Sequence, residues 1–373
     1  MTTIHFETAA LADTLKKAAR IAPMRGREFD SYAGILLSII PGPDDEDDTV
    51  TVRTTDGAVF YTEWMNHLGI EGEEAHWRLP SKVVSDIVNA LPIGSGKKCT
   101  FTEESGRIKI SSGRTRASLG IIQRDYPEWD DFADDLAQTV PGFGARLEQV
   151  AWAVSRKAAQ SNMAAVYLDG ENIVATDGDK LVTAPLELPM DPDNVLVPVA
   201  VLAPILSQMT ETRAAVNDRF LLLQPNDYTQ IKCVLLGEKY PPVANLMNQA
   251  TEETVMFNRE HAIEIVQRIM TVIAKERQNN LDVTIGNGEM IFYTEDEMQM
   301  NSINDALDLD GQCQHEPIRY RFNPEFFLNA ISKAPGMLST LNYTPSKPAQ
   351  PVRFEGEAGY RCWIIPRRAV IAP

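Results

Sequence analysis

The sequence predicts an α+β fold made of three copies of one domain, each with two helices packed on antiparallel sheets. Three observations lead to this prediction: a Thr-Asp-Gly turn that occurs twice, a helix beside a proline that occurs three times, and segment ends that match. A chain of 373 residues is also too long for one ordinary core. Because the features keep the same order in each copy, triplication explains them better than chance.

The first helix of each copy precedes the strands and carries an apolar stripe. The three segments are FETAALADTLKKAARI, FGARLEQVAWAVSRKA and FNREHAIEIVQRIMTVI. In the second segment, Leu147, Val150 and Val154 recur at helical spacing. In the third segment Asn258 is a suitable N-cap, because its side chain can accept hydrogen bonds from the first free N–H groups of the helix.

The second helix of each copy is predicted to start at a proline. The segments are LPSKVVSDIVNALP, VPVAVLAPILSQM and FNPEFFLNAISKA, and their prolines are Pro80, Pro198 and Pro324. A proline suits a helix start, because its missing N–H has no helical partner there. In the second copy Pro204 has to fall in the first turn, since it would bend a helix interior.

The segments between the helices alternate as strands do and hold the Thr-Asp-Gly turns. Thr55-Asp56-Gly57 and Thr176-Asp177-Gly178 are turns of the hairpin type, because Gly tolerates positive φ and Asp bonds its own backbone. Thr294-Glu295-Asp296 holds the same place in the third copy. With acidic linkers between the copies, the predicted domains are residues 1–135, 136–249 and 250–373.

Composition excludes several classes of protein. A net charge of −17 argues against a simple electrostatic nucleic-acid binder. No run approaches the ~20 apolar residues of a membrane span, so we expect a cytoplasmic protein with no membrane partner. The four cysteines are far apart, which indicates neither a zinc site nor a disulfide framework; they are Cys99, Cys233, Cys313 and Cys362.

Enzyme motifs fail when their spacing is tested. PIGSGKKC has Leu91 and Lys98 where a phosphate-binding loop needs Gly and Ser or Thr. The five histidines form no pair with metal-ligand spacing, and HExxH and GxSxG are absent from the sequence. An acidic intracellular hydrolase would lack a nucleophile–base pair. We therefore expect a protein that is not an enzyme and needs no cofactor.

The most specific stretches resemble the bacterial-type DNA sliding clamp, the beta subunit of DNA polymerase III. They are LPSKVVSDIVNALPIGSGKKCTFTEESGRIKISSGRTRASLGIIQRDYPEWDDF, VATDGDKL, KYPPV and the terminal IIPRR. The resemblance covers nearly the whole chain. It implies three DNA-clamp domains per chain and a head-to-tail homodimer that closes into a ring around duplex DNA, with helices lining the hole and sheets outside.

The resemblance also implies a hydrophobic pocket that receives short linear motifs from DNA polymerases and the clamp loader. Its wall would come from three segments far apart in the sequence. Carried over by position, the wall residues are Met163, Thr176, Gly178, Asp179, Lys180, Leu181, Pro241, Asn245, Leu246, Trp363, Ile365, Pro366, Arg367 and Arg368. Apolar anchors and few central charges suit the capture of a peptide.

This chain departs from the family pattern at the predicted pocket. Asp179-Lys180 stands where family members usually have His-Arg, and Asn245 stands where they often have Arg. We therefore expect partner motifs with less negative charge than a typical clamp prefers. The chain also continues past the usual end of the family with Val370 to Pro373.

A second implied site is the dimer interface between first and third domains. Arg107, Arg114 and Arg116 lie on successive strand segments, and the last two are predicted to share one strand face. A solvent-exposed strand is the alternative explanation for these cations. By position, the interface residues are Arg107, Arg114, Arg116, Leu119, Val272, Ile273, Glu295, Asp296 and Glu297.

The third implied site is the DNA contact, which would be to phosphates and independent of base sequence. Arg25 and Arg27 match a loop that touches the duplex in the family, and Arg156 and Lys157 end an inner helix. The first helices carry a small excess of Lys and Arg, although ordinary solvated surface would explain this excess equally. The predicted function is a polymerase processivity clamp; the alternative is a clamp-fold platform for transcription or recombination factors.

Overall fold

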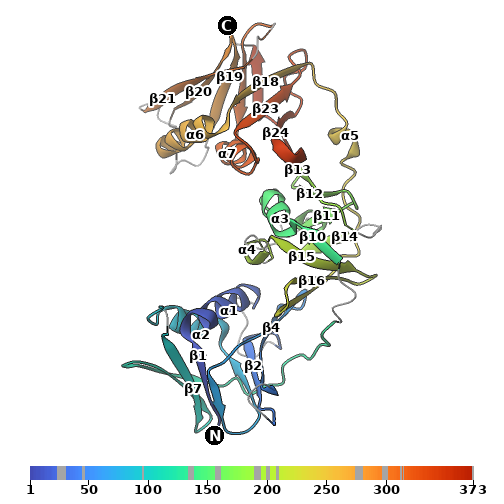
Figure 1. Ribbon diagram of the computed structural model, residues 1–373. Coiled ribbons are helices and arrows are strands. Elements are labelled where there is room, and N and C mark those ends of the chain that lie inside the picture. Colours follow the sequence, from blue (N-terminus) through green and yellow to red (C-terminus); the bar gives the residue numbers. More distant parts are fainter. Residues whose placement is uncertain are drawn as a thin grey trace. The chain divides into compact units, whose positions relative to one another are not determined.

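The computed structural model describes residues 1–22, 31–43, 47–94, 96–132, 138–155, 161–188, 195–198, 202–206, 210–273, 280–295, 301–310, 313 and 315–371. Within it the chain forms two compact units (Figure 1). The first unit comprises residues 1–144 and 200–235, and the second comprises residues 145–199 and 236–373.

The first unit contains two antiparallel sheets, with strand orders β5-β1-β7-β8-β9 and β10-β15-β16-β17-β4-β3-β2-β6. Helix α1 packs against α2 and against strands β3 and β4. The elements are β1 (Thr3–Glu7), α1 (Thr8–Ile21), β2 (Ile35–Ile40), β3 (Thr49–Thr55), β4 (Val59–Trp64), β5 (Gly69–Glu71), β6 (Ala75–Leu79), α2 (Ser81–Asn89), β7 (Lys98–Glu104), β8 (Arg107–Ser112), β9 (Thr115–Gly120), β10 (Gln138–Pro141), α4 (Ala203–Leu206), β15 (Glu211–Val216), β16 (Phe220–Asn226) and β17 (Thr229–Val234).

The second unit also contains two antiparallel sheets, with orders β14-β11-β12-β13-β25-β24-β23-β18 and β21-β20-β19-β22-β26. Helix α3 (Phe143–Ala151) begins in the first unit and ends in the second. The other elements are η3 (Ser161–Ala164), β11 (Ala165–Leu168), β12 (Asn172–Thr176), β13 (Lys180–Pro185), β14 (Val195–Pro198), α5 (Ala244–Met247), β18 (Glu253–Asn258), α6 (Arg259–Ile273), β19 (Leu281–Gly286), β20 (Glu289–Glu295), β21 (Ser302–Asp308), β22 (Ile318–Phe322), α7 (Pro324–Ser332), β23 (Leu338–Tyr343), β24 (Val352–Glu355), η4 (Glu357–Gly359), β25 (Arg361–Ile364) and β26 (Arg368–Ile371).

The order of elements repeats along the chain. A strand, a helix, four strands, a second helix and three strands follow one another from β1, from β10 and from β18, with β5, α5 and β26 as additions. Each eight-stranded sheet joins strands from two successive copies, through the β4–β17 pair in the first unit and the β13–β25 pair in the second. The residue boundaries of three domains stay a prediction, because the compact units follow these shared sheets instead.

Helix starts agree with the sequence at some positions and differ at others. Asn258 Oδ1 accepts from the His261 N–H at 2.9 Å, which confirms the predicted N-cap. Pro324 is the first residue of α7, as predicted. The prediction was wrong for Pro198, which ends β14, while α4 begins only at Ala203. Pro204 therefore lies in the first turn, the one place where α4 tolerates it.

Three of the cysteines, Cys99, Cys233 and Cys362, are buried, and all four are free thiols. Burial raises the pKa of the Cys99 thiol to about 11, so this thiol is a weak nucleophile. No described helix is both long and apolar enough to cross a membrane. The described residues contain no group of three or more His, Cys, Asp or Glu side chains placed to hold a metal ion.

Candidate functional site

The two Thr-Asp-Gly segments form the same turn. In each turn the Asp carboxylate accepts two backbone N–H groups: Asp56 Oδ1 from residues 58 and 59 at 2.9 and 2.8 Å, and Asp177 Oδ1 from residues 179 and 180 at 3.0 and 3.1 Å. Gly57 and Gly178 have φ of +91° and +93°, which L side chains rarely adopt. The predicted turn type is confirmed at both positions.

The second turn is joined directly to the C-terminal segment of the chain. Strands β13 and β25 pair so that Leu181 lies opposite Trp363. The Ile365 N–H then donates to the Asp179 carbonyl at 3.1 Å, just past the end of β25. Two of the three segments predicted to form the pocket are therefore neighbouring strands of one sheet.

The third predicted segment covers the same sheet face. Val174, Leu181 and Trp363 form a buried apolar cluster with exposed fractions of 1 to 2%. Half-buried side chains pack against this cluster from β11 and from the segment that contains α5; they are Tyr167, Tyr240, Val243, Leu246 and Met247. The rings of Tyr167 and Tyr240 stack with centroids 5.1 Å apart. The structure thus brings all three predicted segments together.

A cavity of about 530 Å³ opens beside the apolar cluster. Its wall is mainly apolar, with one acidic and one basic side chain; the lining residues are Tyr167, Asp169, Val174, Lys239, Tyr240, Pro241, Pro242, Val243, Ala244, Met247 and Asn248. Burial raises the pKa of the Tyr240 phenol well above its usual value. The phenol is therefore neutral at physiological pH, and the cavity can hold an apolar group without facing a phenolate charge.

Several predicted wall residues lie at this site. Thr176 is buried, and its hydroxyl donates to the Lys180 carbonyl at 2.6 Å. Ile365 exposes 43% of its surface, and Pro241 lines the cavity. Other predicted residues stand at the rim or behind it: Gly178, Asp179 and Asn245 are exposed, Met163 is half-buried in η3, and Pro366 is buried.

The prediction was wrong for Lys180, whose side chain does not face the cavity. Successive residues of a strand point to opposite faces, so Lys180 lies behind Leu181. Its ammonium group pairs with Asp177 and lies 4.1 Å from the centre of the Phe326 ring. The Trp152 ring centre lies 5.5 Å away from the same ammonium group. Lys180 therefore anchors the turn to the helical side of the sheet.

Arg367 also departs from the predicted pocket wall. Its backbone N–H donates to the Arg321 carbonyl at 2.7 Å, and its guanidinium donates to the Asn280 side chain at 3.0 Å. Arg368 begins β26, whose backbone pairs with β22 opposite Arg321. Both arginines therefore belong to the five-stranded sheet of the second unit, because the chain crosses to that sheet after Pro366. The residues past the usual family end extend β26 as far as Ile371.

The first turn lies in a different setting, because its own linker covers it. The Trp129 ring packs edge-on against Phe60 with centroids 5.2 Å apart, and its indole N–H donates to the Thr62 hydroxyl at 3.2 Å. Arg53 donates to Asp131 at 2.8 Å and lies 5.7 Å from the centre of the Trp129 ring. The linker thus occupies the sheet face beside the first turn.

The predicted interface cations are exposed, with one correction of position. Arg107 and Arg116 lie on the outer face of the β8–β9 hairpin, while Ile108 and Leu119 lie on its buried face. The prediction that Arg114 shares a strand with Arg116 was wrong, because Arg114 belongs to the turn before β9. Leu119 exposes only 5% of its surface, so it stabilises the chain's own core and offers little area to a partner.

The opposite half of the predicted interface is only partly described. Glu295 is exposed at the end of β20 and accepts a hydrogen bond from the Tyr293 hydroxyl at 2.8 Å. Asp296 and Glu297 lie outside the described residues, and Val272 and Ile273 are described only as backbone at the end of α6. Strands β9 and β21 are terminal strands of the two five-stranded sheets.

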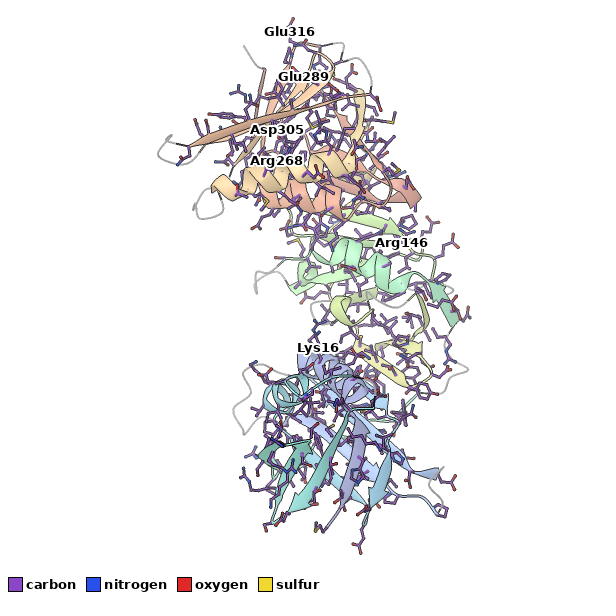
Figure 2. The ribbon with its side chains drawn as sticks, turned by 60° about the vertical axis from the view of Figure 1, so that its left-hand side comes forward. Lys16, Arg146, Arg268, Glu289, Asp305 and Glu316 are labelled. Carbon is purple, nitrogen blue, oxygen red and sulfur yellow. The ribbon has the colours of Figure 1, made fainter. Side chains whose placement is uncertain are left out.

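All four predicted DNA contacts, Arg25, Arg27, Arg156 and Lys157, lie outside the described residues. The described first helices carry other cations, among them Lys16 on α1, Arg146 on α3 and Arg268 on α6 (Figure 2). Arg268 donates from Nε and Nη2 to one oxygen, Oδ2, of Asp305, and this hydrogen bonding lowers the pKa of the Asp305 carboxyl.

A second helix cation is neutralised in a similar way. The Lys17 ammonium nitrogen lies 2.8 Å from a carboxylate oxygen of Asp13 and 3.4 Å from one of Glu63. Burial alone would lower the pKa of Lys17, but the Glu63 and Asp13 carboxylates outweigh burial and raise it. Lys17 and Arg268 therefore offer less net charge to a polyanion than their number suggests.

Sequence reasoning missed ten residues that form the cluster or line the cavity. They are Tyr167, Asp169, Val174, Lys239, Tyr240, Pro242, Val243, Ala244, Met247 and Asn248. A signal for Tyr240 was present, because Tyr126-Pro127 and Tyr240-Pro241 close successive copies of the repeat. Tyr126 accepts the Thr55 backbone N–H at 3.0 Å, so the first of these tyrosines contacts a Thr-Asp-Gly turn. Tyr167 and Val174 needed the strand register, which the sequence alone does not supply.

Comparison with known proteins gives matches over nearly the whole length of the chain. The beta sliding clamp of Streptomyces coelicolor is 22% identical over 395 residues, covering 98% of this chain and 99% of that relative. The DNA polymerase III beta subunit of Thermotoga maritima superposes with a TM-score of 0.81 at 18% identity, covering 99% of this chain and 100% of that one. No protein-family model matches the sequence.

A further solved structure agrees with these matches. The sliding clamp of Bartonella birtlesii, solved bound to griselimycin, has a TM-score of 0.80 at 18% identity and covers 99% of this chain and 100% of that one. The chain therefore has the sliding-clamp fold over its whole length, with mixed helices and antiparallel sheets. All three of these relatives are named as sliding clamps or as DNA polymerase III beta subunits.

Proposed function

We propose that this protein is a DNA sliding clamp, a processivity factor without catalytic activity of its own that tethers a polymerase to duplex DNA. The observation that carries the proposal is the match in fold to polymerase beta subunits over 99% of the chain. The curated relatives carry the same name as the structural neighbours, which favours a clamp over a platform for transcription or recombination factors.

The apolar cluster and its cavity are the proposed binding site for partner motifs. Leu181 and Trp363 form the floor, while Ile365, Pro241 and Leu246 remain accessible to a ligand. A short peptide loses conformational freedom when it binds, so we expect a dissociation constant on the order of micromolar. The cavity lining contains one acidic side chain, Asp169, and one basic side chain, Lys239, so its net charge is small.

The proposed assembly is a head-to-tail homodimer in which β9 of one subunit meets β21 of the other. Both are terminal strands, which can extend a sheet across an interface. Arg107 and Arg116 lie on the β9 side, and Asp308 and Glu295 lie on β21 and its neighbour. A head-to-tail contact closes a ring when each subunit spans the right angle.

Charge reversal tests the proposed assembly. The double variant Arg107→Glu/Arg116→Glu should be a monomer by light scattering, because like charges would meet across the strand edges. The matched control Arg219→Glu/Lys239→Glu changes two exposed cations away from both edges and should remain dimeric. A monomeric wild-type protein, or a double variant that dimerises as well as the control, would exclude this assembly.

Topological linkage tests the function itself. Because the described helix cations are partly neutralised, we expect weak binding to linear duplex that falls steeply with salt. After loading on a closed DNA circle by a clamp loader, the protein should stay bound at salt concentrations that release it from linear DNA. Cutting the circle should then release it. Equal lifetimes on the circular and the cut DNA would exclude a sliding clamp.

A further inference from the structure

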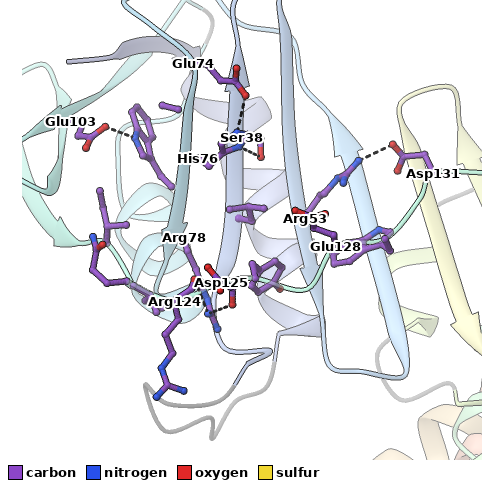
Figure 3. A pocket seen from close by; sticks show the side chains of 18 of the residues that line it. Ser38, Arg53, Glu74, His76, Arg78, Glu103, Arg124, Asp125, Glu128 and Asp131 are labelled. Carbon is purple, nitrogen blue, oxygen red and sulfur yellow. Dashed lines mark hydrogen bonds and ion pairs between the residues drawn. The ribbon is translucent and has the colours of Figure 1, made fainter.

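A trough of about 1170 Å³ lies in the first unit, between the outer face of the eight-stranded sheet and the segment 121–131 (Figure 3). Its floor comes from β2, β3 and β6, and includes Leu36, Ser38 and His76. The linker forms the opposite wall with Tyr126 and Trp129. This trough belongs to neither the apolar cluster nor the terminal strand edges described above.

Carboxylates outnumber cations around the trough. Its acidic lining residues are Glu74, Glu103, Asp125, Glu128, Asp130 and Asp131, and its arginines are Arg53, Arg78 and Arg124. Arg53 is paired with Asp131. Arg78 is 2% exposed, and its guanidinium donates hydrogen bonds to the backbone carbonyls of residues 31, 33, 124 and 125. Six carboxylate residues thus line the trough beside three arginines, one of which already pairs with Asp131. The trough is therefore negatively charged.

The trough also runs along an open sheet edge. Strand β6 is the terminal strand of its sheet, and Ala75, His76 and Trp77 line the trough. Among the described residues, the outer edge of β6 receives one backbone hydrogen bond from outside its sheet, from the Ile122 N–H to the Arg78 carbonyl at 2.8 Å. An edge of this kind can pair with an added extended segment.

We propose that this trough binds an extended cationic segment of a partner protein, which adds to the β6 edge and places Lys or Arg side chains against Glu74, Asp125 and Glu128. Charge selects this occupant. A nucleic acid is a polyanion, and a second copy of the chain carries the same net charge of −17, so the carboxylates disfavour both.

A direct binding experiment with the full-length protein tests the trough. The probe is a fluorescein-labelled peptide of alternating Lys and Thr, about eight residues long, which in extended form places all lysines on one side. Its binding is measured by fluorescence anisotropy at low salt. The trough variant is Glu74→Gln/Asp125→Asn/Glu128→Gln. The matched control, Glu187→Gln/Asp218→Asn/Glu211→Gln, removes three exposed carboxylates elsewhere.

We expect the trough variant to weaken binding about five-fold or more and the control to weaken it less than about two-fold, because three close ion pairs are lost only in the first. Amide exchange in residues 75–79 should slow when the peptide is bound. Equal weakening in both variants would show general attraction to an acidic surface and would overturn the proposal, as would unchanged exchange in β6. The Leu181→Ala/Ile365→Ala variant should bind the probe normally, so failure here is separate from failure of the partner pocket.

Discussion

The two Thr-Asp-Gly turns share one backbone design but have opposite surroundings. Aligned on the turns, Phe60 corresponds to Leu181 and Arg53 to Val174. Their strand partners extend the comparison, since Lys232 lies opposite Phe60 as Trp363 lies opposite Leu181.

The register adds one more pair to this comparison. On the first face, Leu36 lies between Arg53 and Arg78 on the neighbouring strands. On the second face, Tyr167 lies between Val174 and Leu196 in the same way. Arg78 therefore corresponds to Leu196. Cations on the first sheet face are thus replaced by apolar side chains on the second. The first face holds its own acidic linker, whereas the second face keeps an apolar cavity open. The face beside a repeated turn therefore forms an apolar peptide site only where it lacks the cations that hold the linker.

The largest difference is expected between the two tryptophans. Trp363 exposes 2% of its surface, so Trp363→Ala should lower the free energy of unfolding by about 3–5 kcal/mol. Trp129 is half-buried, and its removal loses ring contacts with Phe60 and Tyr126 and one hydrogen bond, so Trp129→Ala should cost about 1–2 kcal/mol. Urea unfolding of the two variants measures the difference. Equal losses would contradict the idea that the second cluster is a true core.

Arg78 tests how strongly the first face holds its linker. Its guanidinium donates to four backbone carbonyls, two of them in the linker at Arg124 and Asp125. Arg78→Met should lower the free energy of unfolding by about 2–4 kcal/mol, because the buried carbonyls lose their donor. Arg114→Met, in an exposed turn, is the control and should change stability little. A loss no larger than that of the control would show that the carbonyls find other donors.

The turn glycines should differ by a smaller amount. Alanine at either position takes a φ near +90°, which costs about 1–2 kcal/mol. At Gly57 the added Cβ would also lie 3.1 Å from the Tyr32 ring, whereas at Gly178 it would meet nothing within 4 Å. Thermal unfolding should therefore rank Gly57→Ala below Gly178→Ala. The reverse order would mean that the first turn relaxes more easily than its surroundings suggest.

Salt concentration should change the stability of the linker on the first sheet face only, and the change should be small. Arg53 and Asp131 are partly exposed, so Asp131→Asn should cost only about 0.2–1 kcal/mol. Raising the salt concentration should speed amide exchange in residues 126–132 of the wild type and leave the variant nearly unchanged. Residues 240–247, held by apolar contacts, provide the internal control. Equal salt sensitivity in both segments would remove the electrostatic distinction between them.

The sequence predicted the turns, because these depend on local hydrogen bonding. The three pocket segments were indicated only by the resemblance to sliding clamps, because they lie far apart in the sequence. The opposite facing of Lys180 and Leu181 was also accessible, since strand neighbours point to opposite faces. The replacement of Arg53 by Val174 could be read from the aligned turns. The replacement of Lys232 by Trp363 could not, because it depends on the register of strands far apart in sequence. The compact units escaped prediction for the same reason, since the sheets cross the domain boundaries.

One measurement decides whether the second turn region, and not the sheet face beside the first turn, holds the polymerase motif of a sliding clamp. It is hydrogen–deuterium exchange of the full-length protein with and without the DNA polymerase of its source. We expect slower exchange in residues 174–181, 240–247 and 363–365 when the polymerase is bound, and no change in residues 53–62. Protection confined to residues 53–62, or no protection in the second region, would contradict it.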